Sequence, residues 1–137
     1  MITRVNPPEL HQTPGYAHVT IVEAGRTAHL AGQCPLDASG KVVNGLDAQV
    51  DQVIANAMTA LEAVGAKPDQ VVRSVIYVVS SQTPVLAAVW TRLNASPLGP
   101  AFTTASTLLG VAQLGFTGQL VELDLTAALP PRPAEAP

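Results

Sequence analysis

Residues 101–124, AFTTASTLLGVAQLGFTGQLVELD, are the stretch around which the rest of the chain is organised. Their first part is rich in Thr and Ser and predicts a β-strand, the segment Gly115–Gly118 predicts a turn, and the last part predicts a second strand that carries two carboxylates. Small hydroxyls, a glycine and a carboxylate therefore gather on two strands late in the sequence. This gathering makes the stretch our first candidate for a site.

The composition of the whole chain indicates one domain with a sizeable core. With 137 residues, 47% hydrophobic and 12% charged, the chain is too apolar to be disordered and fits a single domain. In a typical soluble domain about a quarter of the residues are charged, and this chain has about half that share. We therefore expect some of the uncharged surface to be buried against other subunits, the alternative being a small alanine-rich monomer.

Charge and cysteine content limit the partners and the compartment. The net charge is −3 and the seven Lys and Arg residues are scattered, so nucleic acid is not an expected partner. The N-terminal residues MITRVNPPEL contain no apolar segment, and no run reaches membrane-spanning length. The single Cys34 fits a reducing compartment. These features predict a cytoplasmic protein that does not contact a membrane.

Hydrophobic periodicity predicts an α+β domain over residues 1–129, with the element order β-β-β-α-β-α-β-β. Strands are expected at 1–5, 16–24, 26–32, 70–80 and in the two parts of 101–129, and helices at 46–64 and 83–94. The second and third strands predict a hairpin that turns at Ala24–Gly25 and pairs Thr20 with His29. The Pro-rich tail 130–137 is expected to be poorly ordered.

The predicted sheet is mixed, with two helices packed on one face. Its strands carry apolar residues on both faces, so the second face is also expected to be covered, which again indicates oligomerisation. Either Asn44 or Asp47 can cap the first helix, and Gly65 suits its end.

Alternation along the last strand places Glu122 and Asp124 on one face and Val121 and Leu123 on the other. Glu122 thus lies beside the strand rich in Thr and Ser, where a carboxylate can act as a general base for water; a solvated edge carboxylate is the alternative. On that neighbouring strand, Ser106 and Thr107 can offer hydroxyls or backbone N–H groups to a carboxylate or carbonyl. The ordinary β-propensity of these residue types explains them equally well.

Cysteine and histidine supply the other candidate groups. Cys34 follows a strand end beside a turn, where it either reaches a cleft as a nucleophile or fills the core. In the predicted hairpin, His18 and His29 are diagonal neighbours. No third ligand is placed near them, so we predict no metal site.

Several segments resemble the RidA/YjgF family, also called endoribonuclease L-PSP. They are AGQCPLDASG at 31–40, the amphipathic helix over 48–65, VVRSVIYVVS at 71–80, and ASTLLGVAQLG with LVELDLTAAL within 105–129. The resemblance covers about residues 6–129 and implies a chorismate-mutase-like α+β fold. It also implies a homotrimer in which three sheets form a barrel-like core with the helices outside. Clefts of the family lie between subunits, and its best-known members hydrolyse reactive enamines and imines.

The resemblance also implies roles for individual residues. Tyr16 corresponds to a tyrosine of the cleft, Gly32 to the glycine of an SGQ motif in which Ala31 replaces the serine, and Glu122 to the glutamate that orients the hydrolytic water. Catalytic members carry P-A-R-S where this chain has TAST at 104–107, so Ser106 replaces the arginine that clamps the substrate carboxylate. Ala87 likewise stands where the family has a cleft asparagine.

Serine cannot reproduce a bidentate arginine–carboxylate contact. We therefore predict a Rid-like hydrolase or deaminase of an arginine-lacking branch, acting without a cofactor on a small imine, enamine or related labile C–N compound. Glu122 and Cys34 are its candidate catalytic residues. The candidate substrate-binding residues are Tyr16, His18, Gly32, Gln33, Ser106 and Thr107.

Other functions fit the same residues. One is a biosynthetic enzyme that cyclises or condenses its substrate in the same cleft, where Cys34 and His18 would gain importance. Another is a non-catalytic trimer that binds a small ligand, which the missing arginine favours. A ribonuclease is disfavoured by the acidic charge and the scattered aromatic residues.

Overall fold

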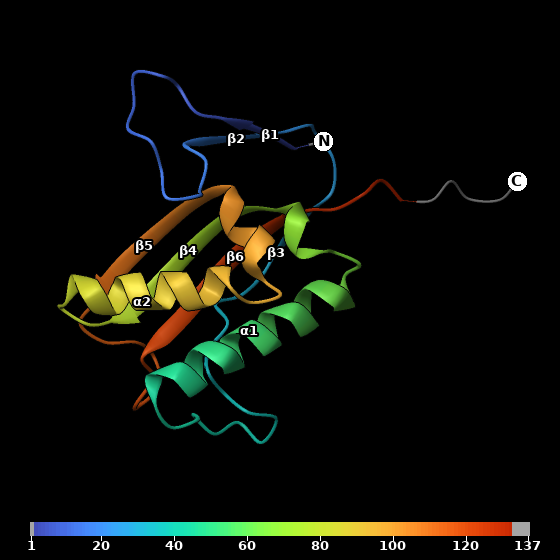
Figure 1. The fold of residues 1–137 in the computed structure, drawn as a ribbon. Coiled ribbons are helices and arrows are strands. Elements are labelled where there is room, and N and C mark those ends of the chain that lie inside the picture. Colours follow the sequence, from blue (N-terminus) through green and yellow to red (C-terminus); the bar gives the residue numbers. More distant parts are fainter. Residues whose placement is uncertain (1, 133–137) are drawn as a thin grey trace, which may run out of the picture.

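The structure is a computed structural model that describes residues 2–132. Strands and helices follow one another in the predicted order (Figure 1). The strands are β1 (Ile2–Val5), β2 (Val19–Val22), β3 (Thr27–His29), β4 (Val71–Val79), β5 (Ala105–Val111) and β6 (Val121–Ala128). The α-helices are α1 (Leu46–Ala63) and α2 (Thr83–Asn94), and short 3₁₀ helices occur at η1 (Pro68–Gln70) and η2 (Gly99–Thr103).

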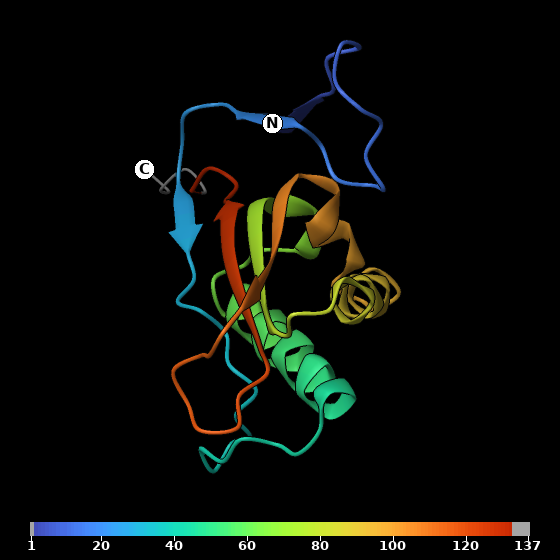
Figure 2. The ribbon, with the colours of Figure 1, turned by 90° about the vertical axis from the view of Figure 1, so that its left-hand side faces the viewer.

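The main sheet is mixed and has the strand order β3-β6-β4-β5. β4 and β5 are parallel, whereas β6 is antiparallel to both β3 and β4. Both α-helices lie on the same side of this sheet (Figure 2). The prediction of an α+β fold with two helices on one face is therefore confirmed.

The core lies between the sheet and the helices. The alternation predicted for the last strand is confirmed, because Val121, Leu123 and Leu125 are fully buried whereas Glu122 and Asp124 are half-buried on the opposite face. β4 alternates in the same way, and its register pairs Tyr77 with Glu122. The helices contribute a continuous apolar stripe to the core; on α1 it consists of Val50, Val53, Ile54, Ala57 and Leu61.

Helix α1 differs from the prediction at its start. Gly45 is the N-cap residue and no side chain caps the helix, so the expected cap from Asn44 or Asp47 is wrong. At the other end, Gly65 has a φ of 74° and its N–H bonds to the carbonyl of Glu62, which is the left-handed stop that the sequence predicted.

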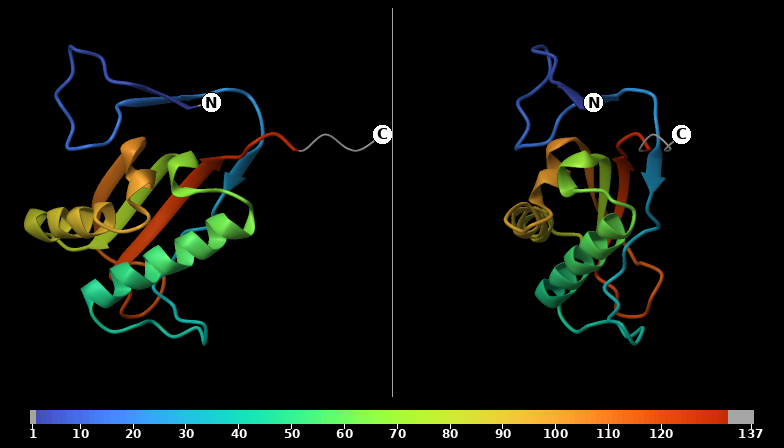
Figure 3. Two further views of the ribbon diagram at one scale, coloured as in Figure 1. Left: turned by 45° about the vertical axis from the view of Figure 1, so that its right-hand side comes forward. Right: turned by 90° about the vertical axis from the view of Figure 1, so that its right-hand side faces the viewer.

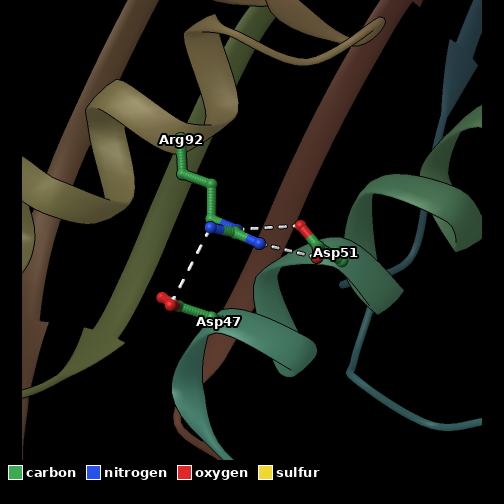
Figure 4. Close-up of polar contacts among 3 residues, drawn as sticks. All are labelled: Asp47, Asp51 and Arg92. Carbon is green, nitrogen blue, oxygen red and sulfur yellow. Dashed lines mark hydrogen bonds and ion pairs between the residues drawn. The ribbon is translucent and has the colours of Figure 1, made fainter.

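An exposed arginine joins the two helices. The guanidinium of Arg92 on α2 donates two hydrogen bonds to the carboxylate of Asp51 on α1, at 2.9 and 2.8 Å, and lies 3.8 Å from Asp47 (Figure 4). The hydrogen bond from Arg92 lowers the pKa of Asp51. Because the pair is exposed, we expect it to add little to stability.

The predicted hairpin between the second and third strands is wrong. β2 pairs with β1, with Ile21 opposite Thr3, and β3 pairs with β6, with His29 opposite Thr126. The two-stranded β1–β2 hairpin crosses above the end of the main sheet, outside its layers (Figures 1 and 3). His18 and His29 are consequently not neighbours in one sheet, and the face they were expected to share does not exist.

Two contacts at the start of β2 explain this outcome. The N–H of Ala17 donates to the carbonyl of Thr104 at 3.2 Å, and the hydroxyl of Thr20 accepts from the N–H of Ala105 at 2.8 Å. These contacts hold β2 at the β5 edge of the sheet, whereas β3 forms the opposite edge. The chain between the two strands therefore extends across the sheet instead of turning.

Two expectations concern the ends and the surface of the chain. The predicted poorly ordered tail 130–137 lies mostly outside the described residues, because the description ends at residue 132. Among residues 2–132, no helix combines the length and the hydropathy needed to cross a membrane.

Candidate functional site

Backbone pairing positions the candidate base. After β3, the chain continues along β6: the N–H of Leu30 bonds to the carbonyl of Leu125, and Gln33 exchanges two backbone hydrogen bonds with Leu123. This pairing lays Gly32 directly against the side chain of Glu122. A Cβ atom on Gly32 would lie 2.8 Å from the carboxyl carbon of Glu122, so only glycine leaves room for the carboxylate.

Two donors fix one oxygen of that carboxylate. The thiol of Cys34 donates to Glu122 Oε1 at 3.1 Å, and the amide of Gln119 donates to the same oxygen at 3.1 Å. The other oxygen, Oε2, faces the backbone of Gly32 and accepts no hydrogen bond from the residues that the structure describes. One carboxylate oxygen is thus held while the second is left for a ligand or water.

The environment of Cys34 keeps its thiol protonated. Burial, together with the hydrogen bond and negative charge of Glu122, raises the pKa of Cys34 to about 11. A thiolate nucleophile needs a lowered pKa. In this arrangement Cys34 acts as a hydrogen-bond donor to the carboxylate.

Polar side chains of α1 hold the loops that carry these donors. Asn56 donates to the carbonyls of Cys34 and Leu36, at 3.0 and 2.9 Å. The fully buried Gln49 donates to the carbonyls of Val43 and Gly118 and accepts from the N–H of Leu120; all of these bonds are 3.0 Å or shorter. Gln119, which lies between Gly118 and Leu120, is thereby kept in place. We call Gly32, Gln33, Cys34, Gln119 and Glu122 the carboxylate half-site.

A separate pocket of about 540 Å³ lies beside α2 and β5. Its lining contains no charged side chain and consists of Pro14, Tyr16, Ala87, Trp90, Thr91, Ser106, Thr107 and Leu108. The rings of Tyr16 and Trp90 meet edge to face, with centroids 6.2 Å apart. We call these eight residues the aromatic half-site.

Ser106 lies in this pocket where the resemblance expects an arginine. Its hydroxyl accepts a hydrogen bond from the buried Ser74 at 2.7 Å and donates to the carbonyl of Thr104 at 3.0 Å. The neighbouring Thr107 accepts a hydrogen bond from Arg73 at 3.3 Å. Ser106 is therefore tied into the sheet and presents a neutral surface to the pocket.

The loop before β2 adds two imidazoles behind Tyr16. His11 Nε2 lies 3.0 Å from the Tyr16 hydroxyl, and His18 Nε2 donates to the carbonyl of His11 at 2.8 Å. His18 thus supports His11 and is not part of the pocket lining. His11 was missed by sequence reasoning, because it lies in a Pro-rich loop with no periodicity that would predict its partner.

The predicted site residues fall into two groups within one chain. Gly32, Gln33, Cys34 and Glu122 are brought together, and Tyr16, Ser106 and Thr107 are brought together in the other half-site. Ser106 pairs with the buried Ser74 and shares its helix-covered face, whereas Glu122 pairs with Tyr77 on the opposite face. The sheet therefore separates Ser106 from Glu122. Because β4 lies between β5 and β6, the expectation that Glu122 lies beside the strand rich in Thr and Ser is wrong. Among residues 2–132, no group of three or more His, Cys, Asp or Glu side chains could hold a metal ion.

Two helices on one face of a β3-β6-β4-β5 sheet, with a glutamate of the last strand lying against a glycine, define an α+β domain with a candidate small-molecule site. The family model for endoribonuclease L-PSP matches residues 9–129. The chain belongs to this family, which is the RidA/YjgF family.

Solved structures agree with this assignment. YyfB from Yersinia pestis, described as a protein of unknown function of the conserved Rid family, is 35% identical; the match covers 93% of this chain and 98% of YyfB, with a TM-score of 0.84. RidA from an Antarctic Psychrobacter is 23% identical over 87% of this chain and 92% of its own, with a TM-score of 0.67. Yeast YEO7 is 24% identical; the match covers 93% of this chain and 98% of YEO7, with a TM-score of 0.66. The search of curated proteins found no match.

Proposed function

We propose that the protein hydrolyses a small imine, or the enamine that tautomerises to it, and that its substrate carries no carboxylate. The observation that carries this proposal is the Glu122 carboxylate, whose Oε1 is held by Cys34 and Gln119 while Oε2 is left without a donor among the described residues. A fixed carboxylate with one available oxygen suits a general base for water.

The reaction needs only water and proton transfer. Glu122 takes a proton from water as the water oxygen bonds to the imine carbon, and the π electrons of the carbon–nitrogen double bond move to nitrogen, which receives a proton. The resulting carbinolamine loses ammonia, so that one imine and one water molecule become one carbonyl compound and one ammonia molecule. The protonated thiol of Cys34 holds the carboxylate in position and takes no part in bond making.

The aromatic half-site supports the choice of a neutral substrate. It offers the hydroxyls of Tyr16 and Ser106 together with the apolar surfaces of Trp90 and Leu108. The lining itself holds no cation; the guanidinium of Arg73 bonds to the lining residue Thr107 from outside it. A hydrogen bond to a charged group is worth about 1.5–3 kcal/mol, so we expect imino acids to bind roughly 10- to 100-fold more weakly than neutral imines of equal size.

We further propose that the active assembly is a homotrimer whose clefts join the two half-sites of different copies. Two features support it: Ser106 of the aromatic half-site and Glu122 of the carboxylate half-site lie on opposite faces of one sheet, and the face that carries Glu122 and Tyr77 is not covered by either helix. A low charged fraction, 12% of residues, is also typical of a surface buried by assembly.

The proposed reaction is tested with imines produced in situ. A flavin amine oxidase supplies neutral imines and an amino-acid oxidase supplies imino acids, and semicarbazide competes for each imine. We expect the protein to lower semicarbazone formation strongly for neutral imines and weakly for imino acids. Glu122→Gln should abolish this effect, while the control Glu62→Gln, an exposed residue of α1, should keep it.

Two results would contradict the proposal. Equal turnover by wild type and Glu122→Gln would remove Glu122 from the mechanism. Absence of turnover for every imine, together with a rise in melting temperature on adding neutral carbonyl or amine ligands, would favour a non-catalytic ligand-binding protein. The neutral lining of the aromatic half-site is the observation that favours this second function.

A further inference from the structure

We propose that the β1–β2 hairpin is an arm that binds a second copy of this chain, where β2 pairs with the free edge of strand β3. In this exchange the two strands that the sequence predicts to pair do so between chains and not within one chain. The exchange also brings the aromatic half-site of one copy to the carboxylate half-site of the other.

Both strands have an open edge. Within residues 2–132, β2 pairs only with β1 and β3 pairs only with β6, so one side of each strand lacks a ladder partner. An open edge is a template for another strand, and a two-stranded hairpin alone is at best marginally stable. The hairpin lies outside the layers of the main domain, where a second chain has access to it (Figure 3).

The side chains of the two strands match in one register. Val19 and Ile21 on one face of β2 are 44% and 50% exposed, which is unusual for two large apolar residues on one short strand. In the register that pairs Thr20 with His29, Ile21 lies opposite Ala28 and Val19 opposite Leu30. Ala28 and Leu30 pack against the core.

Pairing in this register therefore extends the apolar layer of the second copy by two residues. It places the polar Thr20 and His29 together on the other face.

A second copy is the occupant because the chain's own arm is held elsewhere. Ala17 and Thr20 bond to the start of β5, and the guanidinium of Arg4 donates to the carbonyl and hydroxyl of Thr103. β5 and β3 are opposite edges of a four-stranded sheet, about 14 Å apart. With its base fixed at β5, β2 cannot lie along its own β3, whereas the β3 edge of another copy is free to receive it.

The linker 23–26 is the hinge of this exchange. Its sequence, EAGR, suits the tight turn of a closed hairpin, yet in the structure it connects strands of two different sheets. Exchange of an identical element through such a linker is a low-cost route to assembly, because the strand pairing that a closed hairpin would make within one chain is made with the partner.

The exchange also places the chain before β2 near the site of the second copy. Beyond the paired strands, the segment that carries Tyr16 runs towards Gly32 and Gln33 of that copy, while Ala17 keeps its hydrogen bond to Thr104 of its own chain. Tyr16 lines the aromatic half-site, and Gly32 abuts Glu122. The exchange therefore joins the two half-sites across the chain boundary. The proposed strand pairing is argued from the open edges of β2 and β3 and from their apolar faces. Only its consequence for catalysis rests on the proposed function.

Disulfide trapping tests the pairing. In a Cys34→Ser background, Ile21→Cys and Ala28→Cys are made in separate chains, unfolded together, refolded and oxidised. Directly opposite residues have Cβ atoms close enough for a disulfide. We expect a covalent dimer, at twice the mass of one chain on a non-reducing gel, only in the mixture. Thr3→Cys replaces Ile21→Cys in the matched control, because Thr3 lies on β1 away from the open edge, and it should give no dimer.

The chain that carries both Ile21→Cys and Ala28→Cys separates the two topologies. Disulfide-linked oligomers support the exchange. A monomer closed by an internal disulfide means that β2 pairs with β3 of its own chain, which overturns the inference. If Ala28→Cys does not fold, the pair Thr20→Cys and His29→Cys is used, since His29 is exposed. Folded variants that form no disulfide in either pair also overturn the inference. The readout needs no substrate, so lack of imine turnover with intact crosslinking would count against the proposed function alone.

Discussion

The carboxylate of Glu122 lies against the backbone of Gly32, so closely that residue 32 has no room for a side chain. Gly32 does not have a positive φ, so glycine is needed here for space and not for backbone conformation. Backbone pairing of Gln33 with Leu123 holds the two residues together. The site thus depends on the register between two strands, since a shift of one residue would turn Glu122 towards the helices.

Gly32→Ala should displace the carboxylate without unfolding the chain. The added methyl group forces the end of the Glu122 side chain away from Cys34 and Gln119, and because this end is flexible we expect a loss of stability of only about 1 kcal/mol. If Glu122 is the general base, imine turnover should fall roughly 100-fold or more. Urea unfolding and the semicarbazide competition assay measure both effects.

The matched control is Gly115→Ala, because a Cβ at residue 115 meets no atom within 4 Å and the backbone there is not left-handed. This variant should behave like wild type. Full turnover by Gly32→Ala would show that the position of the carboxylate against residue 32 does not matter.

Alkylation of Cys34 should depend on pH in a way that reports on Glu122. The pKa of Cys34 is about 11 in the folded protein, against an ordinary value of 9.0, so iodoacetamide should label the native chain with a midpoint near pH 11 and the urea-unfolded chain near pH 9. Because folding raises this pKa, the contribution of Cys34 to stability is constant below pH 9 and declines as the pH rises from 9 to about 11.

Glu122→Gln separates the causes of this shift. The substitution removes the negative charge beside the thiol but leaves its burial, so the labelling midpoint of the native variant should fall between 9 and 11. Asp37→Asn is the control, because Asp37 bonds to Ser39 and Lys41 and should leave the midpoint unchanged. An unchanged midpoint in Glu122→Gln would mean that the thiol does not contact the carboxylate in solution.

Much of the fold could be predicted because its pattern is local. The apolar stripe of α1, the β-branched run of β4 and the alternation of β6 each follow from spacing within one segment. The same alternation placed Glu122 on the face opposite Val121 and Leu123, which are buried in the structure. These features need no knowledge of a distant partner.

The errors concern contacts between segments far apart in the chain. The pattern of β2 and β3 suits a hairpin, but bonds from Ala17 and Thr20 to the start of β5 hold β2 at the other edge. Gln119 and His11 were missed for a related reason, since each is a polar residue in a loop whose partner is set by tertiary structure. No local periodicity marks such a residue.

Gln49→Leu should destabilise the protein strongly. Gln49 is 1% exposed, and its amide satisfies the backbone of Val43, Gly118 and Leu120. Leucine leaves these buried groups without partners, which we expect to cost about 3 kcal/mol or more. Urea unfolding measures the change.

The exposed Gln113→Leu, in the loop between β5 and β6, is the matched control for Gln49 and should change the free energy of unfolding by less than about 0.5 kcal/mol. A similar small change in Gln49→Leu would mean that water replaces the amide as the partner of these backbone groups.

Ser106→Arg should change which imines are turned over. A guanidinium in the aromatic half-site offers a carboxylate a charged contact worth about 1.5–3 kcal/mol, so the preference for imino acids over neutral imines should rise roughly 10- to 100-fold. The substitution also removes the hydrogen-bond partner of the buried Ser74, which should lower stability by about 1–3 kcal/mol.

Ser106→Met is the matched control for this change of charge, because it adds length without charge and removes the same hydrogen bond to Ser74. The ratio of the two turnover rates, measured with neutral and carboxylate-bearing imines of equal size, separates charge from bulk. An equal ratio in the Arg and Met variants would show that residue 106 does not face the substrate, and that the selectivity for neutral imines has another origin.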